Sequence, residues 1–123
     1  MNKTFPIKEK LRNISYFANV SDSSLSEISD LFIDKKYAMG ETITFGETLP
    51  EYVYILIDGQ VRQLIQHPLN KKTTTLSLYK ANHIIGWTSL QTNYPSEFIT
   101  AASDCTVLRI DSIKWNIRTG KHI

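Results

Sequence analysis

The strongest constraint on the fold is an apolar run, Tyr-Val-Tyr-Ile-Leu-Ile, that fills residues 52–57 and is followed at once by Asp58-Gly59. A short apolar run of β-branched and aromatic residues, bounded by turn residues, predicts a strand that is buried on both faces. An Asp-Gly pair between two apolar runs is a strong hairpin signal. Residues 60–65 are therefore expected to form the antiparallel partner of residues 52–57.

Further short segments with a two-residue period follow Gly40. A second turn is expected at residues 68–71, because the sequence Pro-Leu-Asn-Lys is typical of a chain reversal. Several short strands at near-regular spacing favour an antiparallel barrel or sandwich. The additional strands that we expect are residues 42–45, 73–79, 97–101 and 106–110.

Helices are expected on both sides of the strands. Pro6 suits the first turn of a short N-terminal helix, and either Ser21 or Ser24 can cap the next helix. Ser24 has Glu27 at the spacing of a capping box. Asp111 can cap a last helical turn. The apolar residues of these three segments are Ile7, Leu11 and Ile14; Leu25, Ile28, Leu31 and Phe32; and Ile113 and Trp115.

Composition and charge exclude several kinds of protein. The chain has 123 residues, with 14 Lys and Arg against 12 Asp and Glu, and this balance is too even for a typical nucleic-acid-binding domain. No stretch approaches the roughly 18 apolar residues of a membrane span, and the first residues lack the apolar core of a signal peptide. We therefore expect one cytoplasmic domain that binds no nucleic acid and does not insert into a membrane.

The residues that could carry catalysis do not form the pattern of an enzyme. A metal-binding jelly-roll enzyme would show a His-x-His pair, whereas His67, His83 and His122 are isolated. Cys105 could act as a nucleophile with one of these histidines, but its place at the start of an apolar strand favours a buried, inert thiol. No metal, catalytic residue or enzymatic activity is therefore expected, and a small jelly-roll enzyme is kept as a third hypothesis.

Residues 86–98 interrupt the strands. Gly86 follows an apolar pair, residues 88–91 can form one helical turn, and Tyr94-Pro95 restarts an extended chain. A strand, a glycine, a helical turn and another strand can present backbone N–H groups to an anion. On local pattern alone, an ordinary connection between strands is the simpler interpretation, because a single glycine is weak evidence.

Four motifs occur in a fixed order: Gly-Glu-Thr-Ile at residues 40–43, Tyr-Ile-Leu-Ile-Asp-Gly-Gln-Val at 54–61, Gly-x-x-Ser-Leu at 86–90 and Thr-Ala-Ala at 100–102. This order resembles the cyclic nucleotide-binding domain family, which includes catabolite activator proteins and kinase regulatory subunits. The resemblance implies a mainly β fold: an eight-stranded antiparallel β-roll, or jelly roll, with short N-terminal helices. A one-turn helix in the insert would belong to the family's phosphate-binding cassette.

The resemblance also implies the organisation of the chain. We expect a single domain over residues 1–123, with a helical lead-in at 6–32, the β-roll at 36–110 and the start of a C-terminal helix at 111–123. In the family, one or two further helices follow the last strand, so we expect a fragment of a larger protein.

The ligand residues depart from the family pattern, which reads Gly-Glu-x-Ala/Ser-Leu and then Pro-Arg-Ala/Ser-Ala. In the family, the Glu binds the ribose 2′-hydroxyl and the Arg neutralises the cyclic phosphate. Here Trp87 takes the Glu position, Ser96 takes the Arg position, and Glu97 and Phe98 take the two small positions. The candidate ligand-binding residues that the resemblance implies are Gly86, Trp87, Thr88, Ser89, Leu90, Ser96, Glu97 and Phe98.

These departures predict weak binding of a cyclic nucleotide. A buried phosphate needs a charged partner, whereas Ser96 offers one neutral hydrogen bond and Glu97 would repel the phosphate if it faced the pocket. Losing both anchors costs roughly 3–5 kcal/mol, or about two to four decades of affinity. Trp87 is expected to fill the pocket, with stacking on a planar ligand as the alternative. Replacing Ser96 by Arg and Trp87 by Glu together is expected to restore affinity.

The variant Gly-Trp-x-Ser-Leu followed by Pro-x-Glu resembles the N-terminal domain of some bacterial, mainly cyanobacterial, peptidase-containing ABC exporters for toxins and bacteriocins. We therefore expect a regulatory domain without a tightly bound cofactor, whose partners are other domains of a parent protein such as a membrane transporter. A small-molecule ligand and a homodimer stay open. The alternative hypothesis is a functional sensor of cyclic AMP or cyclic GMP, in which a basic residue, Arg62 or Lys80, replaces the missing Arg.

Overall fold

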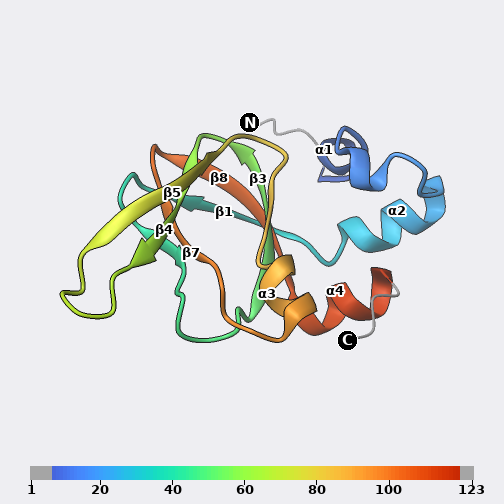
Figure 1. Ribbon diagram of the computed structural model, residues 1–123. Coiled ribbons are helices and arrows are strands. Elements are labelled where there is room, and N and C mark those ends of the chain that lie inside the picture. The colour runs from blue at the N-terminus through green and yellow to red at the C-terminus, as the bar shows by residue number, and fades with distance from the viewer. Residues whose placement is uncertain (1–6, 120–123) are drawn as a thin grey trace.

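The computed structural model describes residues 7–119 of the chain, and the side chains of residues 7–115 (Figure 1). The strands form two antiparallel four-stranded sheets, with the orders β1-β8-β3-β6 and β2-β7-β4-β5. This arrangement confirms the expected mainly β fold with eight strands. The strands are β1 Ile33–Tyr37, β2 Thr42–Thr44, β3 Tyr52–Asp58, β4 Val61–Gln66, β5 Thr73–Tyr79, β6 Ile84–Ile85, β7 Phe98–Ala101 and β8 Cys105–Asp111.

The helices of the N- and C-terminal segments gather at one end of the sheets, and the hairpin of β4 and β5 points away from them (Figure 1). Within residues 7–119, no helix combines the length and the apolar character that crossing a membrane requires. The helices are α1 Ile7–Arg12, the 3-10 helix η1 Ser15–Phe17, α2 Asp22–Ser29, α3 Trp87–Thr92 and α4 Ser112–Thr119.

The helix caps agree with the predictions, and the structure decides between the two serines that could cap α2. Ser21, and not Ser24, is the N-cap of α2, because the Ser21 side chain accepts a hydrogen bond from the Ser24 N–H at 3.2 Å. Asp111 caps α4 as expected, since its Oδ1 accepts from the Ile113 N–H at 2.9 Å. α2 is shorter than the predicted apolar stripe, whose last two residues, Leu31 and Phe32, lie beyond the end of the helix.

The expected hairpin across Asp58-Gly59 is wrong, because β3 and β4 lie in different sheets. β3 pairs with β8 and β6, whereas β4 pairs with β5 and β7. The turn packs tightly: Gly59 has a φ of +97°, and a Cβ there would lie 2.5 Å from the Asp104 carbonyl oxygen. The Gln60 carbonyl accepts from the Ala102 N–H at 2.8 Å, so the chain is held at the end of β7 as it passes between the sheets.

The second expected turn, at residues 68–71, is confirmed and joins β4 to β5 as a hairpin. The His67 N–H donates to the Lys72 carbonyl at 2.8 Å, and the Lys71 N–H donates to the His67 carbonyl at 3.0 Å. The expected strand ends otherwise agree with the structure to within about one residue.

The first strand begins earlier than the β-roll boundary that we placed at residue 36. β1 starts at Ile33, and four of its five residues are exposed. Its central residues Asp34, Lys35 and Lys36 are charged, so no alternation of apolar and polar residues marks the strand.

The core is divided by β3, as the apolar run at residues 52–57 predicts. Val53 and Ile55 pack with the helices in one cluster, and Tyr54 and Leu56 pack between the sheets in a second cluster. Side chains alternate between the two faces of a strand, so one strand supplies both clusters. Trp115 of α4 closes the helical cluster and is 1% exposed.

Replacing Trp115 by Ala is expected to lower the free energy of unfolding by about 3–5 kcal/mol, because it leaves a large cavity in the helical cluster. The matched control is Ile113→Ala in the same helix, where the side chain is 68% exposed. That control is expected to change stability by less than about 0.5 kcal/mol in urea denaturation. Similar losses in both variants would contradict the position of α4.

Candidate functional site

The insert between β6 and β7 holds the helical turn that the sequence predicts, as α3. Gly86 begins the turn with a φ of +98°, and a Cβ at this position would lie 2.9 Å from the Tyr52 carbonyl oxygen. Asn93 ends the helix in the left-handed region, with its N–H directed at the carbonyls of Leu90 and Ser89. Glycine at position 86 is therefore required by both backbone conformation and space.

The side-chain carboxylate of Glu97 accepts hydrogen bonds from the backbone N–H groups of this turn. Glu97 is 7% exposed and lies directly before β7. Its Oε2 accepts from the Gly86 N–H at 2.9 Å, and its Oε1 accepts from the Ser89 N–H at 3.0 Å and from the Ser89 hydroxyl at 2.8 Å. Hydrogen bonds to a charged acceptor are stronger than neutral ones. These three bonds fix the Glu97 carboxylate on the donors of the cassette, and we call this arrangement the closed cassette.

The backbone around Glu97 is fixed from both neighbouring strands. The Thr44 hydroxyl donates to the Glu97 carbonyl at 2.7 Å in a buried position. The Gln63 Nε2 donates to the Ser96 carbonyl at 3.2 Å, and the Ser96 N–H donates to the Ser89 hydroxyl oxygen at 3.2 Å. The position of the Glu97 carboxylate is therefore set by β2, β4 and the cassette together.

The Trp87 side chain, which we expected to fill the ligand pocket, packs against the helical cluster. Its ring packs edge-on against Tyr16 at 4.8 Å and Trp115 at 5.4 Å between centroids. Leu90, one turn later on α3, joins the same helical cluster. Trp87 is the first residue of α3, and its side chain lies on the side of α3 that faces η1 and α4. Trp87 therefore brings the insert into contact with α4.

The structure brings together only part of the predicted site. Thr88 is exposed, and its carbonyl accepts from the Thr92 hydroxyl at 2.9 Å. Phe98 lies on β7 and lines a hollow of about 430 Å³, together with Tyr94, Pro95 and residues of β4. The candidate residues that meet in one hydrogen-bonded group are Gly86, Ser89, Ser96 and Glu97, and those outside it are Trp87, Thr88, Leu90 and Phe98.

Sequence reasoning missed three side chains in contact with one another, Gln63, Tyr79 and His83, of which Gln63 donates to the Ser96 carbonyl. The Tyr79 hydroxyl donates to Gln63 Oε1 at 2.9 Å, and the His83 ring stacks on the Tyr79 ring at 3.7 Å. Burial lowers the pKa of His83, and the carboxylate of Glu97 opposes that shift. The one available signal was the spacing of Gln63 from the buried Val61, which places both side chains on the same face of β4.

The basic residues proposed as substitutes for the missing Arg do not reach the cassette. Arg62 is exposed, and its Nη1 donates to the Thr75 hydroxyl at 3.3 Å. Lys80 is also exposed. Neither residue takes part in the ion pairs found among the described residues, which join α1 to Asp22 and Asp34. Arg109 of β8 stacks over the Tyr52 ring, with its guanidinium carbon 4.2 Å from the ring centroid.

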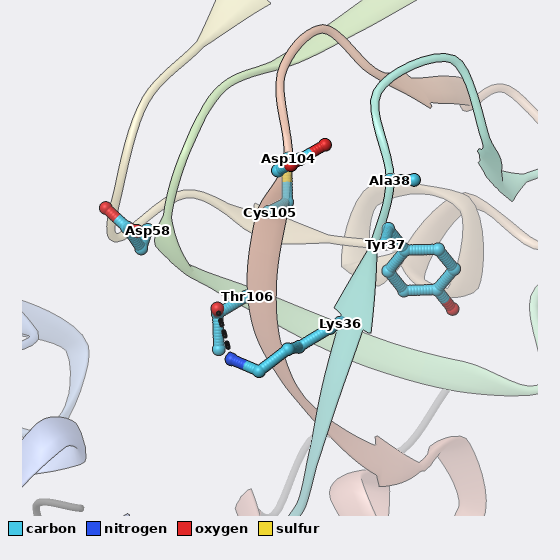
Figure 2. Close-up of a pocket in the computed structure, with 7 residues that line it drawn as sticks. All are labelled: Lys36, Tyr37, Ala38, Asp58, Asp104, Cys105 and Thr106. Atoms are coloured by element: carbon cyan, nitrogen blue, oxygen red, sulfur yellow. Dashed lines mark hydrogen bonds between the residues drawn. The ribbon is translucent and has the colours of Figure 1, made fainter.

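The cysteine has the buried position that the sequence predicts. Figure 2 shows Cys105 among the residues that line a hollow of about 330 Å³, formed at the ends of β1 and β3 and the start of β8. Its sulfur lies 3.1 Å from the carbonyl oxygens of both Gln60 and Ser103. The cavity lining contains no histidine that could activate a thiol. Over the part of the chain that the structure describes, no three His, Cys, Asp or Glu side chains gather as metal ligands.

The sequence profile described as cyclic nucleotide-binding domain matches residues 34–116. The chain belongs to this family. The matched residues include the insert with Gly86 and Ser89, and Glu97 after it.

Solved structures share the fold of this cyclic nucleotide-binding domain. The regulatory domain of Toxoplasma gondii PKA with cAMP matches with a TM-score of 0.84 at 15% identity, over 93% of this chain and 44% of that chain. The regulatory subunit of a cAMP-independent protein kinase A from Trypanosoma cruzi, bound to guanosine, gives 0.80 at 16% identity, over 92% and 40%. A putative cyclic nucleotide-binding protein from Geobacter metallireducens gives 0.77 at 21% identity, over 98% and 85%. A search of curated proteins by sequence finds no match.

The chain thus spans less than half the length of the two kinase regulatory proteins. Both of those proteins are regulatory parts of kinases. In these two proteins the fold is therefore part of a longer regulatory protein.

Replacing Glu97 by Ala is expected to lower the free energy of unfolding by about 2–4 kcal/mol, because the buried N–H groups of Gly86 and Ser89 lose their acceptor. Glu97→Gln keeps one acceptor oxygen for Ser89 but turns its NH2 group toward the Gly86 N–H, so it is expected to lose part of this stability. The matched control is Glu47→Ala, where the side chain is exposed. Urea denaturation of the three variants measures these differences, and equal stability of Glu97→Ala and Glu47→Ala would contradict the closed cassette.

Proposed function

We propose that the chain is a regulatory cyclic nucleotide-binding-like domain, not an enzyme, whose cassette holds its own carboxylate in place of a ligand phosphate. The observation that carries this proposal is the set of three hydrogen bonds from Gly86 and Ser89 to the buried carboxylate of Glu97. Tight binding of cyclic AMP or cyclic GMP is not expected from such a cassette.

Three physical costs stand against a cyclic phosphate. The phosphate would have to displace Glu97 from its amides, or approach a carboxylate at short range. Two like charges about 4 Å apart repel by roughly 4 kcal/mol at an effective dielectric constant near 20. Ser96, at the position of the family's Arg, is uncharged and cannot offset this repulsion.

Calorimetric titration with cyclic AMP and cyclic GMP tests the proposal. The unmodified chain is expected to show no binding up to millimolar ligand. The variant with Ser96→Arg and Glu97→Ala is expected to bind at least about tenfold more tightly, because it gains a cation and frees two amides. We choose Glu97 as the second position, in place of Trp87, because Trp87 packs in the helical cluster.

The control variant is Ser96→Arg alone, in which the new guanidinium can pair with Glu97 and is expected to leave affinity low. Micromolar binding by the unmodified chain would favour the alternative function, a sensor of cyclic AMP or cyclic GMP with a non-standard pocket. No gain in the folded double variant would show that Glu97 is not the obstacle to a nucleotide.

A second candidate ligand is an uncharged nucleoside. The similar structure from Trypanosoma cruzi is of a cAMP-independent regulatory subunit bound to guanosine, which carries no phosphate. An uncharged ligand would not compete with Glu97 for the cassette amides. The same titration with guanosine and adenosine separates the cases, since heat from a nucleoside alone would support this candidate.

We further propose that the domain acts on other parts of a parent protein through α4. The contact of Trp87 with Trp115 supports this route, because it connects the cassette directly to the helix that leaves β8. The parent that we propose is a bacterial toxin- or bacteriocin-exporting ABC transporter of the cyanobacterial type, with this domain on its cytosolic face. The reading frame of the gene tests the proposal. We expect it to encode peptidase, membrane and ATPase domains, and a frame with other effector domains would contradict it.

A further inference from the structure

Strand β5 is an open edge of the second sheet. It pairs with β4 on one side, and it is the last strand in the order β2-β7-β4-β5. Five of its seven residues are exposed. The hairpin that carries it extends away from the helices (Figure 1). An edge strand presents a row of unpaired N–H and C=O groups that can pair with another chain.

The other edges of the sheets carry the features that prevent such pairing, and β5 does not. β1 has three charged residues among five, β2 is three residues long, and β6 is two residues long. The sequence of β5, Thr-Thr-Thr-Leu-Ser-Leu-Tyr, contains no charge, glycine or proline. Short edges and charges on an edge strand are the usual protection against strand addition. Of these edges, β5 is therefore the one best suited to accept a further strand.

The surroundings of β5 are apolar and positively charged. Leu76 and Leu78 of β5 and Ile65 of β4 are each more than half exposed. The whole segment between Asp58 and Glu97 contains no acidic residue. Its basic residues lie at both ends of β5 and beside it: Lys71 and Lys72 before the strand, Lys80 after it, and Arg62 opposite Leu78 on β4.

We propose that the β5 edge binds an extended peptide segment of a partner protein, which adds a strand to the sheet and carries acidic residues on both sides of an apolar, β-branched centre. Backbone hydrogen bonds to β5 would give affinity, and the exposed leucines and flanking lysines would give selectivity. A second copy of the chain fits less well. Antiparallel pairing of two β5 strands centred on Leu76 would place Lys72 opposite Lys80 at both ends, and like charges directly opposite are unfavourable.

The probe is a synthetic peptide in which alternating valine and threonine, as many residues as in β5, are flanked by paired glutamates. A matched peptide has lysines in place of the glutamates. With the full 123-residue chain, the acidic peptide is expected to slow amide exchange in β5. Its affinity is expected to exceed that of the basic peptide at least about tenfold and to fall with added salt.

Two variants of the chain make the test specific. Leu76→Glu places an acidic side chain in the middle of the edge at an exposed position, and Lys71→Glu with Lys72→Glu reverses the flanking charge. Each is expected to weaken binding about fivefold to tenfold. The matched control is Lys35→Glu with Lys36→Glu on the β1 edge, which is expected to leave affinity unchanged.

Amide spectra of each variant confirm that it is folded before binding is measured. Three outcomes would overturn the proposal. The acidic peptide could protect no residue of β5, it could protect β1 instead, or sedimentation could show a dimer through β5 that the peptide does not dissociate.

Discussion

Strand β3 is buried on both faces, and the rest of the domain is arranged around this constraint. One face contributes to the cluster under the helices, and the other contributes to the cluster between the sheets. Gly86 also packs against the Tyr52 carbonyl at the start of β3, so the cassette begins on the same strand. A strand with no solvent-facing side must be covered by two independent layers, and the helices and the second sheet provide them.

Glu97 connects the ends of the two sheets. It stands directly before β7, and it accepts a hydrogen bond from Gly86, the residue that follows β6 in the other sheet. The amides that would bind an external anion are instead part of the internal hydrogen-bond network of the fold. Glu97 therefore joins the insert after β6 to the start of β7.

The class of fold could be predicted from the sequence, because the apolar run at residues 52–57 and the family motifs depend on local pattern. The pairing of β3 could not, because Asp58-Gly59 specifies a reversal of the chain and not the strand that the next segment joins. β1 was hidden by its charged residues. At the cassette, the sequence places Trp87 and Ser96 where the family pattern has Glu and Arg, and their effect on a ligand stays a prediction. The hydrogen bonds of Glu97 depend on the direction of its side chain. The contacts of β2 and β4 with the backbone at residues 96 and 97 set that direction, and they are not encoded in local sequence pattern.

The packing of Trp87 on Trp115 gives the domain an internal optical reporter. The chain contains two tryptophans, and they are these two, one in the cassette and one in α4, with ring centroids 5.4 Å apart. Any movement of the cassette relative to α4 must change the surroundings of both indole rings at once. The intrinsic fluorescence of the unlabelled chain therefore reports on the contact through which a signal would leave the domain.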